Sequence, residues 1–386
     1  SYGKLRASVA QVGKDAQPYS IVPALLSQAS TGGGFGYGFT APSPFLRPEM
    51  KTSYEVGTEL KFFNNRLGFD ATYYNSRAVD QIVKDLRLSY GTGFILQVFN
   101  GGTIQNSGVE LQLNATPVVK SDFSWDVLAN FTKQWSELVE LPQDLSEFYV
   151  SDTWLYGNIR NGSRPGGSLT TLTGFDYMRN NNGDILINPA TGFPLRNTSQ
   201  WVVVADRQPD FNIGLTNSFR YKNLSLSFLL DIRKGGDIFN ATEHFLTTRG
   251  LSTRTLDREQ PIIYKGVLKD GNENSDNPTK NNIVIDPYRD LNYWSTVGGV
   301  TEVDFIERDI NWVRMRDFTL GYNVPSALLQ RTKFARSASL FVTGTDLFIL
   351  TNYSGLDPVV NGNSAAVGGS GAAGIDFGNF PMPRGI

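Results

Sequence analysis

The sequence has no cysteine, and His244 is its single histidine among 386 residues. Without cysteine the fold uses neither disulfides nor thiolate metal sites, and one histidine argues against a zinc site. The net charge of −2 provides no electrostatic basis for binding nucleic acid. No stretch approaches the roughly eighteen consecutive apolar residues of a membrane-spanning helix. These absences exclude a helical membrane protein and a disulfide-rich scaffold.

Alternation of apolar and polar residues is the main pattern that is present. Residues 54–82 begin YEVGTELKFFNNRLGFDATYYN, in which every second residue is apolar on each side of Asn64-Asn65. Period-two alternation is typical of strands, and Asn-Asn suits the positive φ of a hairpin turn. The mean hydropathy of −0.25 does not oppose a membrane location, because barrel strands have lipid-facing residues only at alternate positions.

The connections between such strands alternate between short and long along the whole chain. Short turns at one end of the strands and long loops at the other are typical of a transmembrane barrel. The sequence therefore predicts an all-β fold, an antiparallel transmembrane β-barrel with about ten strands here, short periplasmic turns and long extracellular loops. A soluble carbohydrate-binding β-sandwich stays open as an alternative, in which the apolar faces would pack against each other.

The strand LSLSFLLDIRK, residues 224–234, indicates which face meets lipid. Its aliphatic residues share one face, and the other face carries Asp231 and Arg233. Because a cation near the bilayer midplane costs up to about 2–4 kcal/mol, we expect Asp231 and Arg233 to face the lumen. In WVRMRDFTLGYNV, Arg314 and Arg316 share a face with aromatic residues. Either both arginines lie above the membrane edge, or a β-bulge near Asp317 exchanges the faces.

Several segments resemble the SusC-like (SusC/RagA-type) branch of the TonB-dependent outer-membrane receptors. They include LRPEMKTSYEVGTELKFFNNRLGFDATYYN, NGGTIQNSGVELQL, RQPDFNIGLTNSFRYKNLSLSFLLDIRKGGDIFNAT, INWVRMRDFTLGYNVP and TDLFILTNYSGLDPVVNG, in the family's order. The resemblance implies that residues 1–386 are the C-terminal portion of a barrel of about 22 strands, without the plug domain and the N-terminal strands. It also implies a multi-pass protein of the Gram-negative outer membrane, embedded in its lipid bilayer.

The same resemblance implies a function in nutrient uptake. Such receptors import a glycan or peptide, with a SusD-like surface lipoprotein as a lid and with energy transmitted by TonB through the plug. The chain would then have no catalytic activity. A self-contained barrel with an external hydrolase site stays open as an alternative, although it would depend on His244 or on an acidic pair such as Asp144 and Glu147.

Two sets of loop residues are candidates for binding. Exposed aromatic side chains could stack on sugar rings or anchor a partner, or pack within the loops, and four lie in long loops: Trp154, Tyr156, Tyr293 and Trp294. We expect no cofactor, although calcium is left open by four residues at the spacing of calcium-loop ligands: Asp270, Asn272, Asn274 and Asp276. Ser275 replaces the EF-hand glycine and Asn281 the bidentate glutamate, which favours an ordinary solvated loop.

Overall fold

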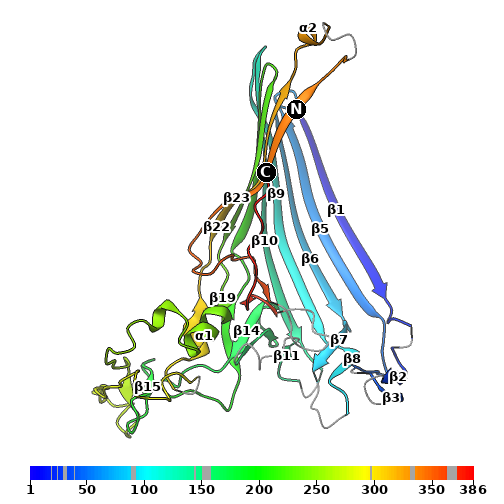
Figure 1. The fold of residues 1–386 in the computed structure, drawn as a ribbon. Coiled ribbons are helices and arrows are strands. Elements are labelled where there is room, and N and C mark those ends of the chain that lie inside the picture. Colours follow the sequence, from blue (N-terminus) through cyan, green and yellow to red (C-terminus); the bar gives the residue numbers. More distant parts are fainter. Residues whose placement is uncertain are drawn as a thin grey trace.

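A nine-stranded antiparallel sheet forms the body of the protein (Figure 1). The computed structural model describes residues 1–18, 20–23, 25–28, 33–38, 40–87, 93–142, 145–149, 158–295, 298–330, 335–362 and 372–386. The strands, in their order across the sheet, are β1 Tyr2–Lys14, β5 Glu49–Phe62, β6 Leu67–Val79, β9 Thr103–Val119, β10 Phe123–Glu140, β17 Phe211–Tyr221, β18 Leu224–Lys234, β22 Trp312–Asn323 and β23 Ser339–Thr351. Each of these nine strands pairs with the next of the nine along the chain. In the part of the chain described here, β1 and β23 do not pair to close the sheet.

The predicted hairpin of residues 54–82 is confirmed as β5 and β6. Val56 pairs with Tyr73 and Leu60 with Phe69, so the apolar residues of the two strands share a face. The turn has positive φ at Phe63, Asn64 and Asn65 (54°, 55° and 67°), the conformation that asparagine tolerates best. Among the described residues, a bridge between Thr345 and Gly385 is all that represents the expected tenth strand beside β23.

The register of the strands separates a polar face from an apolar face across the whole sheet. One row of paired residues, on the polar face, comprises Arg6, Gly57, Thr72, Glu110, Thr132, Asn212, Arg233, Trp312 and Thr351. The adjacent row, on the apolar face, comprises Leu5, Thr58, Ala71, Leu111, Phe131, Ile213, Ile232, Val313 and Leu350. Successive side chains therefore alternate between two environments on all nine strands.

Nothing in the described chain covers the apolar face. No member of the apolar row is buried, and Leu5 and Leu350 at its two ends are 85% and 66% exposed. In a β-sandwich these side chains would be packed between two layers of protein. The sandwich alternative is therefore wrong, and the uncovered face is the one that meets lipid in a transmembrane barrel.

The two ends of the sheet differ in their connections, as predicted (Figure 1). At one end the strands are joined by residues 63–66, 120–122, 222–223 and 324–338, the last of which includes α2 Ser326–Leu329. At the other end the connections are residues 15–48, 80–102, 141–210 and 235–311, followed by the segment after β23. The long connections gather together at the lower end of the view, and the short ones lie at the upper end.

A bulge in β22 exchanges the faces of that strand. Against β18, Met315 and Asp317 pair with consecutive residues, so Arg316 is an extra residue of β22. Against β23 the register shifts at the same place, and there two residues, 346 and 347, lie opposite Arg316. Before the bulge, Trp312 and Arg314 lie on the polar face, and after it Phe318, Leu320 and Tyr322 lie on the apolar face. The predicted bulge near Asp317 is confirmed, and it keeps both arginines away from the apolar face.

The long loops fold into small sheets of their own. Their strands are β2 Leu25–Gln28, β3 Gly34–Tyr37, β4 Thr40–Ala41, β7 Ile82–Arg87, β8 Leu96–Asn100, β11 Phe148–Tyr149, β12 Ile159–Arg160, β13 Gly162–Ser163, β14 Thr171–Gly174, β15 Leu186–Ile187, β16 Val202–Asp206, β19 Ile238–Asn240, β20 Val267–Leu268, β21 Ile306–Glu307, β24 Asn361–Gly362, β25 Ala372–Ala373 and β26 Ile375–Asp376. The helical elements are α1 Ala241–Thr248, η3 Thr253–Thr255 and η4 Glu302–Phe305. Within the described residues, no helix is long and apolar enough to cross a membrane.

A hydrophobic core holds these loops together. Its buried members come from separate connections and are Ile159, Leu172, Val204, Ala205, Phe239, Ala241, Val300, Phe305 and Ile375. A second, smaller cluster of Ile238, Ile310, Trp312, Tyr353 and Val360 joins the loops to the end of β22 that lies next to them. The loops are thus a packed layer fixed to β22, and the polar face of the sheet continues beneath them.

Candidate functional site

A cavity of about 460 Å³ lies where the polar face of the sheet meets the folded loops. We call it the rim cavity. Strands β17, β18 and β22 contribute Asn212, Asp231, Arg233, Trp312 and Arg316 to its lining, and the loops contribute residues 207–209, 236–238, 358–360 and 373–374. Asp231 and Arg233, for which we expected a position in the lumen, therefore lie on the polar face and line one cavity.

A chain of ion pairs runs along one side of the rim cavity and into the loop after β23. Asp231 Oδ2 accepts from Arg316 Nε at 3.1 Å, and Arg316 Nη1 donates to Asp346 Oδ1 at 3.3 Å. The same Asp346 oxygen accepts from Arg314 Nη1 at 3.2 Å, and Arg314 Nη2 donates to Asp357 Oδ1 at 2.5 Å. Arg314 and Asp357 are buried, with side chains 2% and 6% exposed. Arg314 and Arg316 are thus each paired with two carboxylates, and they share Asp346.

Two further arginines of the rim cavity are not neutralised in this way. Arg233 donates from Nη2 to the carbonyl oxygen of Arg207 at 2.5 Å and from Nε to that of Gly235 at 3.2 Å. Arg207 donates from Nε to the carbonyl oxygen of Thr170 at 3.2 Å. These three hydrogen bonds all go to carbonyl oxygens, and over the described ranges no ion pair within 4.0 Å joins either guanidinium to a carboxylate.

The backbone is shaped to bring these two arginines together. Gly236 has φ +96°, and a Cβ at this position would lie 2.6 Å from the carbonyl oxygen of Arg207 and 2.7 Å from Arg233 Nη2. Only glycine fits there. On the other side, the Arg233 guanidinium lies 4.9 Å from the centre of the Trp312 ring, within the range of a cation–π contact. Burial lowers the pKa of Arg207, because the charged guanidinium loses hydration, and the charge of Asp206 partly opposes this effect.

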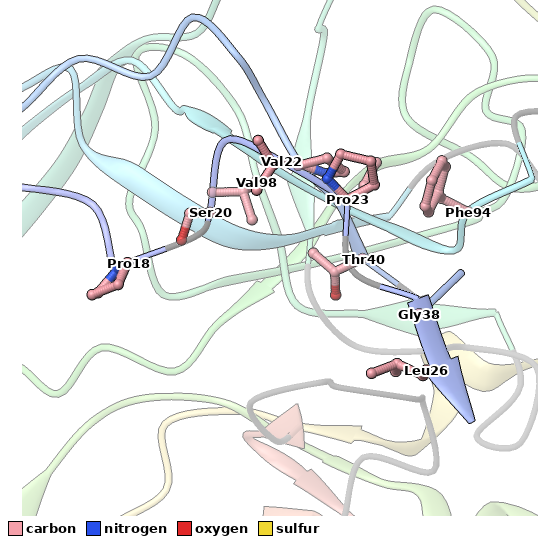
Figure 2. Close-up of a pocket in the computed structure, with 11 residues that line it drawn as sticks. Pro18, Ser20, Val22, Pro23, Leu26, Gly38, Thr40, Phe94 and Val98 are labelled. Carbon is pink, nitrogen blue, oxygen red and sulfur yellow. The ribbon is translucent and has the colours of Figure 1, made fainter. Parts of the chain in front are cut away.

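A larger recess of about 640 Å³ lies on the same face, over β1, β5, β6, β9 and β10. Arg6 donates to both carboxylate oxygens of Asp70, from Nη1 at 2.7 Å and from Nη2 at 2.5 Å, and lies 3.9 Å from Glu55. The positive charge in this recess is therefore satisfied by its own neighbours. A third pocket of about 300 Å³ lies among the outer loops and is lined by uncharged residues, including Val22, Pro23, Leu26 and Phe94 (Figure 2).

The predicted loop aromatics occupy different environments. Trp294 packs against the loop core and donates from its indole nitrogen to the carbonyl oxygen of Pro287 at 2.8 Å, and the Tyr293 ring meets it edge to face at 4.8 Å. Both side chains are half-buried, which agrees with the packing alternative, although their part in binding stays a prediction. Trp154 and Tyr156 lie outside the described residues.

Two side-chain oxygens of the predicted calcium loop accept hydrogen bonds from backbone N–H groups. Asp270 Oδ1 accepts from the backbone N–H of Asn272 at 3.0 Å, and Asn274 Oδ1 accepts from that of Asn181 at 2.9 Å. No cluster of three or more acidic or histidine side chains able to hold a metal occurs in the described part of the chain. Calcium binding by Asp270, Asn272, Asn274 and Asp276 stays an untested prediction.

His244 is buried in the loop core, between the rings of Phe239 and Phe305 at centroid distances of 6.0 and 5.1 Å. Burial lowers the pKa of this imidazole, and Glu302 opposes the shift through its charge. Its Nε2 atom has no hydrogen-bond partner among the described residues. A general base must reach its substrate, and His244 is enclosed by aromatic side chains instead.

Sequence reasoning found Asp231 and Arg233 but missed other residues around the rim cavity. Arg207 follows β16 in a loop with no alternation, so no pattern assigned it to a face. Asp346 belongs to β23, has φ 49° and lies opposite the bulge of β22, and Asp357 lies in the loop that follows β23. The paired arginines of WVRMRD were the one available signal, because two cations at a barrel rim require nearby carboxylates.

These features define a class of protein. An antiparallel sheet with an uncovered apolar face, a polar face rich in ion pairs, and all long loops at one end is the wall of an outer-membrane β-barrel. The model of the TonB dependent receptor-like, beta-barrel family matches residues 2–229. The chain belongs to this family, and its barrel is a SusC-like barrel of the outer membrane.

Curated relatives have similar sequences over most of the chain. TonB-dependent receptor P3 of Formosa agariphila is 26% identical over 361 residues, covering 88% of this chain and 33% of the relative. TonB-dependent receptor SusC of Bacteroides thetaiotaomicron is 25% identical over 341 residues, covering 84% of this chain and 31% of SusC. The chain thus spans about a third of the length of these relatives.

Solved structures have the same fold. The RagAB peptide importer in its closed-closed state matches all of this chain and 40% of the solved chain, with a TM-score of 0.68 and 18% identity. The open-open state of the same importer gives a TM-score of 0.67 at 19% identity. The predicted SusC/RagA-type barrel is confirmed.

Proposed function

We propose that this chain is part of an importer that takes up a glycan or peptide nutrient across the outer membrane. The observation that carries the proposal is the polar face, which bears cavities and continues under the packed loops of a barrel that belongs to a receptor family. In this proposal the polar face lines the lumen, so Asp231 and Arg233 lie on the path of the ligand.

The importer works with two partners and has no chemical reaction of its own. A SusD-like lipoprotein docks on the long loops as a lid, and TonB acts through a plug domain inside the barrel. RagAB, whose fold this chain shares, is described as a peptide importer, and SusC as a TonB-dependent receptor. The folded loop layer supports the lid in this proposal, because a docking surface needs a fixed shape more than a large one.

A growth experiment in the native host tests the proposal. The gene is deleted, and the strain is grown on single peptides and single glycans as the limiting nutrient. We expect growth to fail on at least one nutrient, to return when the gene is restored, and to fail again when the restored strain lacks TonB. Uptake of that nutrient in fluorescent form should follow the same pattern. Growth equal to the parent strain on every nutrient would refute the proposal.

A further inference from the structure

We propose that Arg207 and Arg233 in the rim cavity bind a carboxylate group of the transported solute. This inference deepens the proposed importer function and relies on it for the solute, while the binding itself is tested separately. The ligand class it assigns is a solute with a carboxylate, either a uronate of an acidic glycan or the carboxylate of a peptide.

The charges around the rim cavity are the first argument. Five charged side chains line it: Arg207, Asp231, Arg233, Asp237 and Arg316. Arg316 is paired with Asp231 and Asp346, and Asp237 is paired with Arg308 at 3.2 Å. Asp237 also accepts from the backbone N–H groups of Asp206 and Asp309, at 3.1 and 3.2 Å. Arg207 and Arg233 therefore have no ion-pair partner in the described chain, although the charge of Asp231 acts on Arg233 from beyond ion-pair distance. A low-dielectric wall strengthens the attraction of the two guanidiniums for an anion.

The carboxylate nearest in sequence does not neutralise them. Asp206 Oδ1 accepts from the hydroxyl of Thr170 at 2.6 Å and from the backbone N–H of Gln208 at 3.0 Å. It remains farther than 4.0 Å from both guanidiniums, although its charge acts on Arg207 from that distance. A half-buried pair of like charges is costly for the free protein, and an anion placed between them would relieve that cost.

The free donor atoms are the second argument. Three guanidinium nitrogens, both Nη atoms of Arg207 and Nη1 of Arg233, donate no hydrogen bond to the part of the chain that the structure describes. None of the three is among the buried polar atoms that lack a partner. They are therefore accessible from the cavity. A guanidinium offers parallel N–H groups that match the two oxygens of a carboxylate, and such bidentate pairs are the strong charge-assisted hydrogen bonds.

The rest of the rim cavity suits the remainder of a small solute. Gln208 and Asn212 add amide groups, and the Trp312 ring adds an apolar surface on which a sugar or a side chain can lie. The volume of about 460 Å³ is within the usual range for small-ligand sites. Because peptides and acidic glycans both carry carboxylates, the site predicts a carboxylate ligand and leaves its source to the experiment.

The test is calorimetric titration of the complete receptor, purified from its host in detergent. Two probes carry carboxylates, trigalacturonate and the tripeptide Glu-Glu-Glu, and two matched probes are neutral, maltotriose and acetylated, amidated Gln-Gln-Gln. We expect at least one carboxylate probe to bind and both neutral probes to bind more weakly. The affinity should fall with added sodium chloride, because the attraction is electrostatic.

Three variants locate the binding. Arg207→Gln and Arg233→Gln should each lower the affinity for the carboxylate probe about tenfold or more, since each removes a charged hydrogen-bond donor. Arg233→Lys keeps the charge but not the fork, so it should recover part of the loss and guards against misfolding of the Gln variant. Arg220→Gln is the matched control, because Arg220 lies on the same face at the far end of β17, is exposed and is outside the cavity. It should leave the affinity unchanged.

The outcomes distinguish the two sources of the carboxylate, and they test the arginine site separately from the importer function. Binding of trigalacturonate alone supports an acidic glycan, and binding of the tripeptide alone supports a peptide. Equal binding of charged and neutral probes, or affinity unaffected by both Arg207→Gln and Arg233→Gln, overturns the inference. Arginine-dependent binding in a receptor whose deletion has no growth defect would keep the site and reject the importer. The reverse result would keep the importer and reject the site.

Discussion

Replacing Arg314 by methionine should release the loop that follows β23. The buried guanidinium of Arg314 is paired with Asp357, and the two side chains are 2% and 6% exposed. Removing one member of a buried pair leaves the other charge uncompensated, at a cost of about 3–5 kcal/mol. Since each 1.4 kcal/mol is a factor of ten, the opening of this loop should become about two to four orders of magnitude more frequent.

Hydrogen exchange read by mass spectrometry is the assay. Asp357 also accepts from the backbone N–H groups of Val359 and Met382, at 2.9 and 3.1 Å, so both amides report on this anchor. In Arg314→Met, peptides that contain them should exchange faster, while peptides of β9 and β17 keep their protection. Arg308→Met is the control, because Arg308 is 62% exposed in its pair with Asp237 and such pairs contribute about 1 kcal/mol or less.

A double substitution distinguishes the ion pair from a packing defect. Asp357→Asn removes the stranded charge, so Arg314→Met with Asp357→Asn should recover much of the protection that Arg314→Met loses. Unchanged exchange at Val359 and Met382 in Arg314→Met would refute the reasoning. So would strictly additive effects of the two substitutions, because two groups that interact directly cannot be independent.

Three further predictions test the faces, the loop core and one turn. Leu230→Arg places a cation on the lipid-facing side, at a cost of up to about 2–4 kcal/mol, whereas Leu229→Arg places it on the polar face. Only Leu230→Arg should lower the folded fraction measured by heat-modified gel mobility, and an equal loss of folded protein in both variants would contradict the assignment of the faces. Because burial depresses the pKa of His244 below its ordinary 6.5, the unfolded loops bind a proton that the folded core rejects. Proteolysis of the loops should therefore accelerate as the pH falls from 7.5 to 5, and less so in His244→Gln; an identical pH dependence in both proteins would argue against this origin. In Gly102→Ala, at φ +91°, the new Cβ would lie 2.1 Å from the carbonyl oxygen of Glu140, so urea unfolding should show a loss of about 1–3 kcal/mol, and no loss would mean that the turn readily rearranges.

The strands could be predicted because lipid imposes a strict requirement at every second residue. The predicted bounds of residues 224–234 match β18, and the segment WVRMRDFTLGYNV contains β22, residues 312–323. In β10 the alternation of apolar residues runs from Phe123 to Phe131, yet the strand continues to Glu140. Beyond Phe131, the positions on the apolar face include Lys133 and Glu137, as expected for a part of the strand that extends past the bilayer, where backbone pairing continues without the requirement for apolar residues. Where the solvent changes, the pattern that identifies a strand also changes.

The loop layer could not be predicted, because its contacts join residues far apart in the sequence. Glu302 is 1% exposed and accepts from the backbone N–H of Asn158 at 3.1 Å and from Arg196 at 2.7 Å. Neither a period of two nor one of 3.6 precedes these residues, so nothing local marked them as buried. The sequence leaves Trp294 open as a ligand-binding residue for the same reason: an aromatic residue in a polar loop has no pattern that reveals its packing.

The bulge at Arg316 connects the part of the molecule that is predictable with the part that is not. On the side of the short connections, β22 must present Phe318, Leu320 and Tyr322 to lipid. On the side of the long loops, the same strand must place Trp312 at the rim cavity and the buried Arg314 against its carboxylate partners on the polar side. Trp312 and Arg314 have the same parity as the three aromatic and aliphatic residues. Without an extra residue, one of these groups would face the wrong medium, and a buried or lipid-facing cation costs far more than a local break in hydrogen bonding. The irregularity is therefore a condition for placing a charged cavity at the edge of an apolar wall, and a similar conflict of parity in another barrel strand would mark the level at which its wall ends and its ligand-facing rim begins.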